Sequence, residues 1–219
     1  MQTELNCRAV LFDLDGVLVD SRRAVEFAWE RWAAERGVQN ESLLRLAHGR
    51  RTSESLPEIA PHLDVATEVA NLERIESEEI RGLVPVPGAS ALLGQLRTAQ
   101  WAIVTSGSAK VALTRMRVCG IPTPRVFVTA NDIRNGKPAP EGYLAAASQL
   151  GVDPGDCVVV EDTKVGVAAG KAGGMRVIAV MGTEQREALA EADMVVPALR
   201  EIMVQQNNNG ILIISSHLH

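Results

Sequence analysis

Short apolar runs recur along the chain, and from residue 88 onward segments of mixed polarity and helical length separate them. The runs are AVLF (9–12), WAIV (101–104), VFV (126–128), CVVV (157–160), RVIAV (176–180) and DMVV (193–196). We expect helices near residues 89–98, 109–118, 140–150 and 164–172. Strands that alternate with helices predict a parallel β-sheet covered by helices on both faces. The predicted fold class is therefore α/β, with a doubly wound, Rossmann-like core.

The interval between the first two runs breaks this alternation, because roughly 85 residues there contain no convincing strand. Apolar residues at helical spacing predict helices over 21–36, 41–47, 52–59 and 64–81. Ser21 can cap the first of them, and Pro57 and Pro61 are expected to break the middle of the segment. LVPVPG (83–88) is typical of a stiff linker back to the sheet. A helical cap inserted after the first strand explains this layout best; one continuous domain with a long crossover is the alternative.

The predicted domains follow from this organisation. Residues 1–18 and 83–204 form the core, residues 19–82 the helical cap, and residues 205–219 a terminal tail. Within the tail, Asn-Gly between two apolar runs predicts a small β-hairpin. A short sequence added to the natural chain is the other interpretation of the tail.

Composition narrows the possible partners and the location of the protein. Of 219 residues, 46% are hydrophobic and 3% aromatic, which suits a core of buried parallel strands. The net charge of -5 gives no reason to expect binding to nucleic acid or to a membrane surface. The sequence has no run of about 18 apolar residues, so no transmembrane helix is predicted. The polar start MQTELNC does not resemble a signal peptide. Three cysteines without metal-type spacing argue for reduced thiols, so we expect a protein of the cytoplasm. A monomer is the expected oligomeric state.

Polar side chains follow four of the predicted strands at the point where each strand ends. They are Asp13 and Asp15, Thr105 and Ser106, Lys137 after the segment TAND, and Glu161 and Asp162. In an open parallel sheet, ligands bind at the carboxyl ends of the strands. We therefore expect these residues, which are far apart in the sequence, to meet in one cleft.

The chemistry of this set points to a phosphate group. Four carboxylates in a small volume repel one another, and a hard cation such as Mg²⁺ removes that repulsion. Lys137 adds a positive charge, and SGS (106–108) before a helix offers backbone N–H groups to an anion. One carboxylate can then attack phosphorus to give an aspartyl-phosphate, while another handles protons.

Four motifs in this order resemble the haloacid dehalogenase superfamily, and specifically its phosphatases with a small helical cap after the first motif. They are DLDGV, VTSGS, GKPAP and VVVEDTKVGVAAGKAGG. Four motifs in sequence at strand ends are far more specific than a single D-x-D. The resemblance covers nearly the whole chain. An aspartate at the second position of the first motif, Asp15 here, favours phosphoryl chemistry over dehalogenation.

The resemblance also implies roles for the core residues. Asp13 becomes the nucleophile and a Mg²⁺ ligand, and Asp15 becomes the general acid and base, with its backbone carbonyl on the metal. Thr105 or Ser106, together with the Gly107 amide, holds the phosphate. Two further roles are carried over in the same way: Lys137 neutralises the phosphate and Asp13, and Asp162, assisted by Glu161, completes the metal site.

Within the superfamily, LAHGRRT (46–52), LERIESEE (72–79) and FVTANDIRNGKPAPEGYL (127–144) are similar to bacterial sugar phosphatases and to yeast glycerol and 2-deoxyglucose-6-phosphate phosphatases. By this resemblance His48, Arg51 and Glu76 face the hydroxyl groups of the substrate. For the two basic residues, a solvated turn is an equally good interpretation. A sugar phosphomutase and a non-catalytic sugar-phosphate-binding protein share the core motifs and are the alternative functions.

Overall fold

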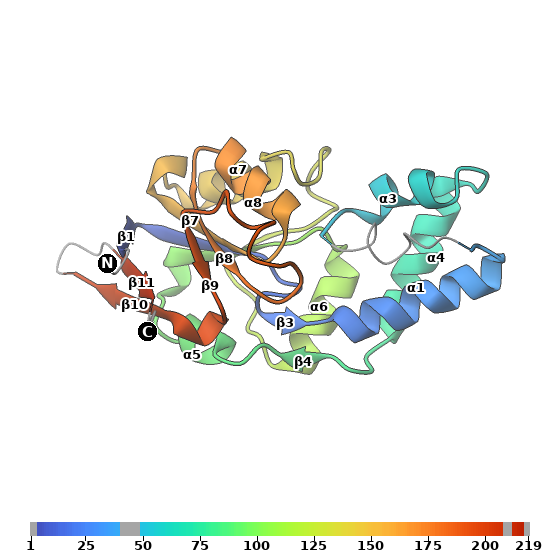
Figure 1. The fold of residues 1–219 in the computed structure, drawn as a ribbon, viewed down its shortest axis with the longest axis horizontal. Coiled ribbons are helices and arrows are strands. Elements are labelled where there is room, and N and C mark those ends of the chain that lie inside the picture. Colours follow the sequence, from blue (N-terminus) through green and yellow to red (C-terminus); the bar gives the residue numbers. More distant parts are fainter. Residues whose placement is uncertain (1–3, 40–48, 208–211, 217–219) are drawn as a thin grey trace.

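The computed structural model describes residues 4–39, 49–207 and 212–216. Its centre is a six-stranded sheet in the order β6-β5-β2-β7-β8-β9, in which every neighbouring pair is parallel (Figure 1). The strands are β2 (Ala9–Phe12), β5 (Trp101–Val104), β6 (Val126–Val128), β7 (Cys157–Glu161), β8 (Arg176–Val180) and β9 (Met194–Val196). Each apolar run of the sequence is one of these strands, so the predicted α/β fold class is confirmed.

Alternate residues of β2 face opposite sides of the sheet, as the pleat of a strand requires. Val10 and Phe12 belong to one apolar cluster, and Ala9 and Leu11 belong to the other. Helices α5 (Ala89–Leu93) and α6 (Ala109–Cys119) contribute to the first cluster, and α7 (Glu141–Leu150) and α8 (Lys164–Ala172) to the second. Helices therefore cover both faces of the sheet, which is the doubly wound arrangement.

Helix α5 is shorter than predicted. It ends at Leu93 instead of residue 98, because Gly94 follows and the chain then tightens into a 3-10 turn, Thr98–Gln100, that leads into β5. Glycine is among the weakest helix formers, so the apolar periodicity alone overestimated the helix. Two further 3-10 turns, Pro154–Asp156 and Leu199–Glu201, precede β7 and β10 (Ile202–Gln206).

The helical insert follows the first strand of the sheet, as expected. Its helices α1 (Arg22–Arg36), α3 (Thr52–Ile59) and α4 (Val65–Glu78) form an apolar cluster of their own around Trp29, Trp32 and Ile75. Residues 83–88, predicted as a stiff linker back to the sheet, contain a short strand that we did not predict, because β4 (Val84–Pro85) pairs antiparallel with β3 (Val19–Asp20). This two-stranded ribbon joins the insert to the sheet. The exact domain boundaries stay a prediction.

Pro57 was predicted to break the middle of the insert, but it lies inside α3. The N–H groups in the first turn of any helix have no acceptor within that helix. In this helix of eight residues, Pro57 therefore removes only one more internal hydrogen bond. Leu56 and Ile59 on either side are buried and pack the helix into the cluster of the insert. The helix predicted over 41–47 lies outside the described residues. No helix in the described part of the chain is long and apolar enough to cross a membrane.

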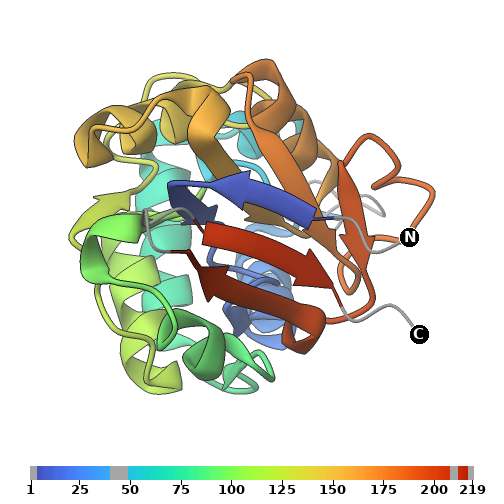
Figure 2. The ribbon, with the colours of Figure 1, turned by 90° about the vertical axis from the view of Figure 1, so that its left-hand side faces the viewer.

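A second sheet joins the two ends of the chain (Figure 2). The predicted terminal hairpin is present as β10 (Ile202–Gln206) and β11 (Leu212–Ser216), although its Asn-Gly turn lies outside the described residues. We did not predict β1 (Glu4–Cys7), which pairs antiparallel with β11 and makes the order β1-β11-β10. Leu5 and Cys7 alternate with exposed residues in β1, so a period-2 signal was present in the polar-looking start.

The terminal hairpin is an integral part of the main core, and this leads to a stability prediction. Ile214 is fully buried in the cluster that contains Val10 and Phe12. We expect Ile214→Ala to lower the free energy of unfolding by about 2–5 kcal/mol, the usual cost of such a core cavity. Gln205→Ala on the exposed part of β10 is the control and should change it by less than about 0.5 kcal/mol. Equal unfolding midpoints in urea for both variants would contradict the placement of β11.

Candidate active site

The acidic residues meet where β2 and β7 end side by side. Phe12 is paired with Val160, and the Asp13 N–H donates to the Val160 carbonyl at 3.0 Å, so Asp13 follows β2 next to Glu161 and Asp162. One carboxylate oxygen from each of these three residues lies within 4.8 Å of the others, and all three side chains are buried. The predicted convergence of residues from separate strands is therefore present.

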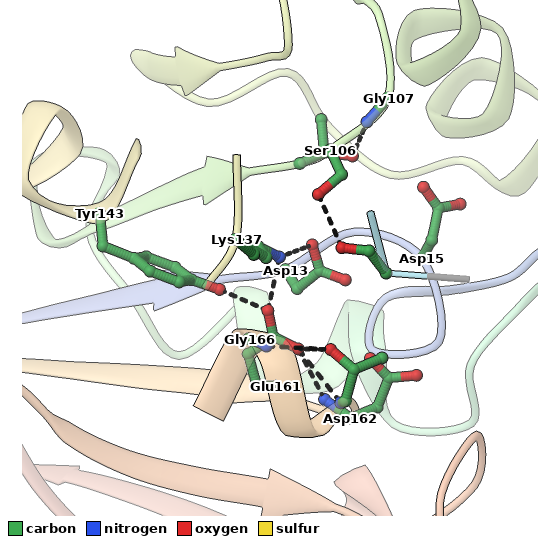
Figure 3. Close-up of polar contacts among 12 residues, drawn as sticks. Asp13, Asp15, Ser106, Gly107, Lys137, Tyr143, Glu161, Asp162 and Gly166 are labelled. Atoms are coloured by element: carbon green, nitrogen blue, oxygen red, sulfur yellow. Dashed lines mark hydrogen bonds and ion pairs between the residues drawn. The ribbon is translucent and has the colours of Figure 1, made fainter. Parts of the chain in front are cut away.

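Lys137 connects two of these carboxylates (Figure 3). Its buried Nζ donates to Asp13 Oδ1 at 2.6 Å and to Glu161 Oε1 at 2.5 Å. Tyr143 from α7 donates its hydroxyl to the same Glu161 oxygen at 2.7 Å. The second Glu161 oxygen accepts hydrogen bonds from the Asp162 N–H and from the N–H and hydroxyl of Thr163. Glu161 is thus held by five protein donors, and it fixes the position of Lys137.

Burial and mutual repulsion determine how these groups titrate. Burial raises the pKa of Asp13 to about 7, although Lys137 acts to lower it. Burial, followed by the charges of Glu161 and Asp13, also raises the pKa of Asp162 well above its usual range. For Glu161, burial acts to raise the pKa, but the charge of Lys137 and the hydrogen bonds outweigh it, so the pKa is lowered. Asp13 and Asp162 therefore favour protons, or another cation, in this site.

The residues present fit a divalent metal ion. Asp162 Oδ1 and Asp15 Oδ1 are buried and have no hydrogen-bond partner in the described part of the chain, whereas Asp162 Oδ2 accepts from the Thr183 hydroxyl. An unpaired buried carboxylate oxygen costs free energy unless a cation or a donor meets it. Hard divalent cations prefer carboxylate oxygens. Asp13 and Asp162 are the best placed ligands, because both Glu161 oxygens already accept hydrogen bonds from the protein.

The predicted phosphate-binding residues lie between β5 and the N-terminus of α6. Thr105 is buried, and its hydroxyl accepts from the Gly107 N–H at 3.1 Å. Ser106 donates its hydroxyl to the Gly49 carbonyl of the insert at 2.9 Å. A cavity of about 60 Å³ lies beside them and reaches Asp13, Asp15 and Asp162. A few water molecules would fill this volume, so it suits a phosphate group.

Asp15 lies at the edge of this cavity, and its partner is a residue that sequence reasoning missed. Arg115 of α6 is buried, and its Nη1 lies 2.8 Å from Asp15 Oδ2. Its Nη2 lies 3.4 Å from Glu76 Oε1 on α4, so the predicted cap residue Glu76 does reach the cavity. A signal was available: Arg115 stands four residues from both Val111 and Cys119, on the apolar face of α6.

Other cap residues that we predicted are placed differently or lie outside the described part. His48 is outside the described residues. Arg51 donates to the Arg134 carbonyl at 2.7 Å and to the Ala130 carbonyl at 3.0 Å, so its guanidinium holds the loop before Lys137. Its predicted contact with substrate hydroxyls stays a prediction.

The comparisons with known proteins agree with this geometry. Residues 7–174 match the haloacid dehalogenase-like hydrolases. The chain belongs to this family. It is 45% identical to hexitol phosphatase A of Escherichia coli (strain K12), over 96% of this chain and 100% of that protein. It is also 36% identical to 2-deoxyglucose-6-phosphate phosphatase 2 of Saccharomyces cerevisiae, with 93% of each chain covered.

Solved structures share the fold of this chain. A hydrolase of this family from Deinococcus radiodurans R1, with bound phosphate and sodium, matches with a TM-score of 0.63 and 28% identity, over 89% of this chain and 93% of that chain. CbbY from Rhodobacter sphaeroides, in complex with xylulose-1,5-bisphosphate, matches with a TM-score of 0.78 and 24% identity, over 89% of this chain and 96% of that chain. The second likeness concerns the fold alone.

The buried Glu161 carboxylate leaves no room at Gly166 in the first turn of α8. A Cβ atom there would lie 1.9 Å from Glu161 Cδ. Alanine stabilises a helix by up to about 1 kcal/mol relative to glycine, but overpacking a core lowers the stability by about 1–3 kcal/mol. We expect Gly166→Ala to destabilise the protein by about 1–2 kcal/mol net in urea unfolding. Gly155→Ala, where nothing lies within 4 Å of the added atom, is the matched control. A neutral or stabilising Gly166→Ala would show that Glu161 is not held as described.

Proposed function

We propose that this member of the haloacid dehalogenase-like hydrolases is a Mg²⁺-dependent phosphatase of small sugar or polyol phosphates. The observation that carries the proposal is the buried contact of Lys137 with Asp13 beside an acidic cluster and a phosphate-sized cavity. The relatives named as hexitol and 2-deoxyglucose-6-phosphate phosphatases support the substrate class. Three free, buried cysteines support the reducing cytoplasm as the place of action.

Asp13 is the proposed nucleophile. Lys137 donates to Asp13 Oδ1, which fixes the carboxylate and leaves Oδ2 for attack on phosphorus. A bond forms between Asp13 and phosphorus while the bond to the ester oxygen breaks, giving an aspartyl-phosphate. Asp15 gives its proton to the departing oxygen, so the sugar or polyol leaves as a neutral alcohol.

The second half of the reaction returns the enzyme to its starting state. A water molecule gives a proton to Asp15, and its oxygen attacks phosphorus in the aspartyl-phosphate. Asp13 is released as a carboxylate together with inorganic phosphate. One carboxyl group, Asp15, therefore acts first as general acid and then as general base.

The charges around the cavity bind the phosphate. We assign the transferred phosphoryl group to Lys137, the hydroxyls of Thr105 and Ser106 and the Gly107 amide, at the positive end of α6. The lysine pKa supports this role, because the charges of Asp13 and Glu161 outweigh burial and raise it, which keeps the amine protonated. Helices of the insert cover the cavity and exclude bulk water during the attack.

The proposed Mg²⁺ ligands are Asp13, the Asp15 carbonyl and Asp162, with Glu161 beside them. When bound, Mg²⁺ neutralises part of the carboxylate charge, favours ionised Asp13 and Asp162, and makes an anionic substrate acceptable.

Removing the nucleophile gives the most direct test of the function. We expect Asp13→Asn to reduce the hydrolysis of p-nitrophenyl phosphate in the presence of Mg²⁺ by at least about 10³-fold, because an amide oxygen cannot form the covalent intermediate. Phosphate release is the measurement, and an unchanged far-ultraviolet circular dichroism spectrum shows that the variant is folded. Wild-type rates in the variant would contradict the assignment.

The same assay separates the alternatives when it is run over sugar, polyol, nucleotide and glycolate phosphates. Fastest release of inorganic phosphate from a sugar or polyol phosphate is the expected result. Conversion of a hexose 1-phosphate to its isomer without phosphate release would indicate a phosphomutase instead. Binding without turnover of any compound would indicate a non-catalytic protein.

Metal binding should compete with protons in this site. The pKa values of Asp13 and Asp162 are raised on folding, so the folded protein binds protons at these carboxyls more tightly than the unfolded chain does. This proton binding stabilises the fold at low pH, and for Asp13 the stabilisation is lost as pH rises through about 7. We expect the metal-free protein to be less stable at pH 8 than at pH 5.5, with Tm falling by roughly 2–4 °C for each kcal/mol lost.

Addition of Mg²⁺ should restore Tm at pH 8 and have little effect at pH 5.5, where protons occupy the carboxylates. Thermal unfolding with and without Mg²⁺ at both pH values is the measurement. The matched variant Asp162→Asn should lose most of the Mg²⁺ effect. A Mg²⁺ effect that is equal at both pH values, or unchanged in the variant, would argue against this metal site.

A further inference from the structure

Arg115 is a buried cation that joins the sheet domain to the helical insert. It belongs to α6, and only 4% of its surface is exposed. On one side its Nη1 contacts Asp15 Oδ2 at 2.8 Å, and on the other its Nη2 contacts Glu76 Oε1 at 3.4 Å. Figure 1 shows α6 beside α4, the helix of the insert that carries Glu76. One guanidinium group therefore links the turn after β2 to the insert.

Packing alone does not explain an arginine at this position. The neighbours of Arg115 on the same face of α6 are the buried residues Val111, Met116 and Cys119, and a methionine of similar size would fit this face. A buried ion pair is often no more stabilising than well-packed apolar residues. The guanidinium Nε also has no hydrogen-bond partner among the described residues, which adds to the cost. Packing and stability therefore give no reason for a charge at this position.

The contacts of Arg115 fix only one of the two Asp15 oxygens. Oδ2 is held by Arg115, whereas Oδ1 is buried and has no partner among residues 4–39, 49–207 and 212–216. Asp15, Glu76 and Arg115 all line the cavity assigned to the phosphate. Gly16 follows Asp15 with a φ of 84°, so a glycine turn holds the backbone while the side chain depends on Arg115 for its orientation.

We infer that Arg115 is a positioning residue that aims the free oxygen of Asp15 at the leaving group, and that Glu76 makes this alignment depend on closure of the insert. The inference rests on the proposed function, because it assumes that Asp15 is the general acid and base. Glu76 follows Ile75 on α4, and Ile75 is buried in the apolar cluster of the insert, so the place of Glu76 is set within the insert. When the insert moves away, Arg115 loses this second anchor and Asp15 is no longer held in one orientation.

A test must separate the positioning of an acid from a general loss of structure. Formation of the aspartyl-phosphate needs a proton donor when the leaving group is a sugar or polyol alkoxide, but p-nitrophenolate leaves without one. The single-turnover rate of this first step is therefore measured by rapid quench with both substrates. The alkyl substrate is the polyol or sugar phosphate that the wild type hydrolyses fastest, and KM is determined in parallel.

We expect Arg115→Met to slow the first step with the alkyl substrate by about 10- to 100-fold, less than the full contribution of a general acid, and with p-nitrophenyl phosphate by less than about 3-fold. KM should change little for either substrate. Arg115→Lys, which keeps the charge, should recover part of the lost rate. Arg117→Met is the matched control, because Arg117 lies on the exposed side of the same helix, and it should affect neither substrate.

Glu76→Gln keeps the inference testable even where Arg115→Met fails to fold. It should reproduce the selective loss with the alkyl substrate, and the double variant should be no slower than Arg115→Met alone, because both act through one contact. Equal loss with both substrates, a rise in KM alone, or additive effects would overturn the inference. A wild type that forms no phosphoenzyme with any substrate would instead refute the proposed function.

Discussion

A charge imbalance at the adjoining ends of β2 and β7 determines much of the structure. Asp13, Glu161 and Asp162 are buried with oxygens within 4.8 Å of one another, and Lys137 is the buried cation that contacts two of them. Glu161 and Lys137 compensate each other, since the charge of the lysine lowers the carboxyl pKa despite burial. At Asp13 and Asp162, burial and the neighbouring carboxylate charges outweigh the effect of Lys137, so their pKa values are raised. In the proposed function, a divalent cation and then a phosphate would complete this charge balance, which protons alone do only at low pH.

The residues packed around this acidic cluster make room for its carboxylates and hold them in place. Gly16 and Gly166 stand where any Cβ would collide with Asp162 or Glu161, so the carboxylates approach the backbone directly. Tyr143, on a helix that otherwise buries small apolar residues, directs its hydroxyl to Glu161 at 2.7 Å. These residues support the charged groups. They lower the stability of the fold, and the burial of apolar surface in the clusters on both faces of the sheet offsets this loss.

The sequence predicted the sheet well because each strand is a short apolar run that ends in polar residues, as in AVLFDLD (9–15). The same logic predicted which side chains meet. It failed where a polar residue stands on an apolar face, as Arg115 does, because its partner Glu76 lies 39 residues away in the chain. It also failed for β1 and β4, whose pairing partners are distant strands. Local periodicity records which face a residue occupies, whereas ion pairs and strand pairing depend on the tertiary fold.

The insert meets the core through polar contacts that lie next to the proposed catalytic groups. Three of them are the Ser106 hydroxyl on the Gly49 carbonyl, the Gly136 N–H on Glu54, and Arg115 on Glu76. The first involves Ser106, a proposed phosphate-binding residue, the second precedes Lys137, and the third adjoins Asp15. Among the described residues, Ala24 of α1 packs in a cluster of the sheet, but the main apolar cluster of the insert is separate from those of the sheet, so little shared core fixes the two together. Hydrogen bonds and ion pairs that water can replace suit a lid that opens in each cycle. In the proposed mechanism, closure would bring these contacts together beside Lys137, the proposed phosphate site and the proposed acid Asp15.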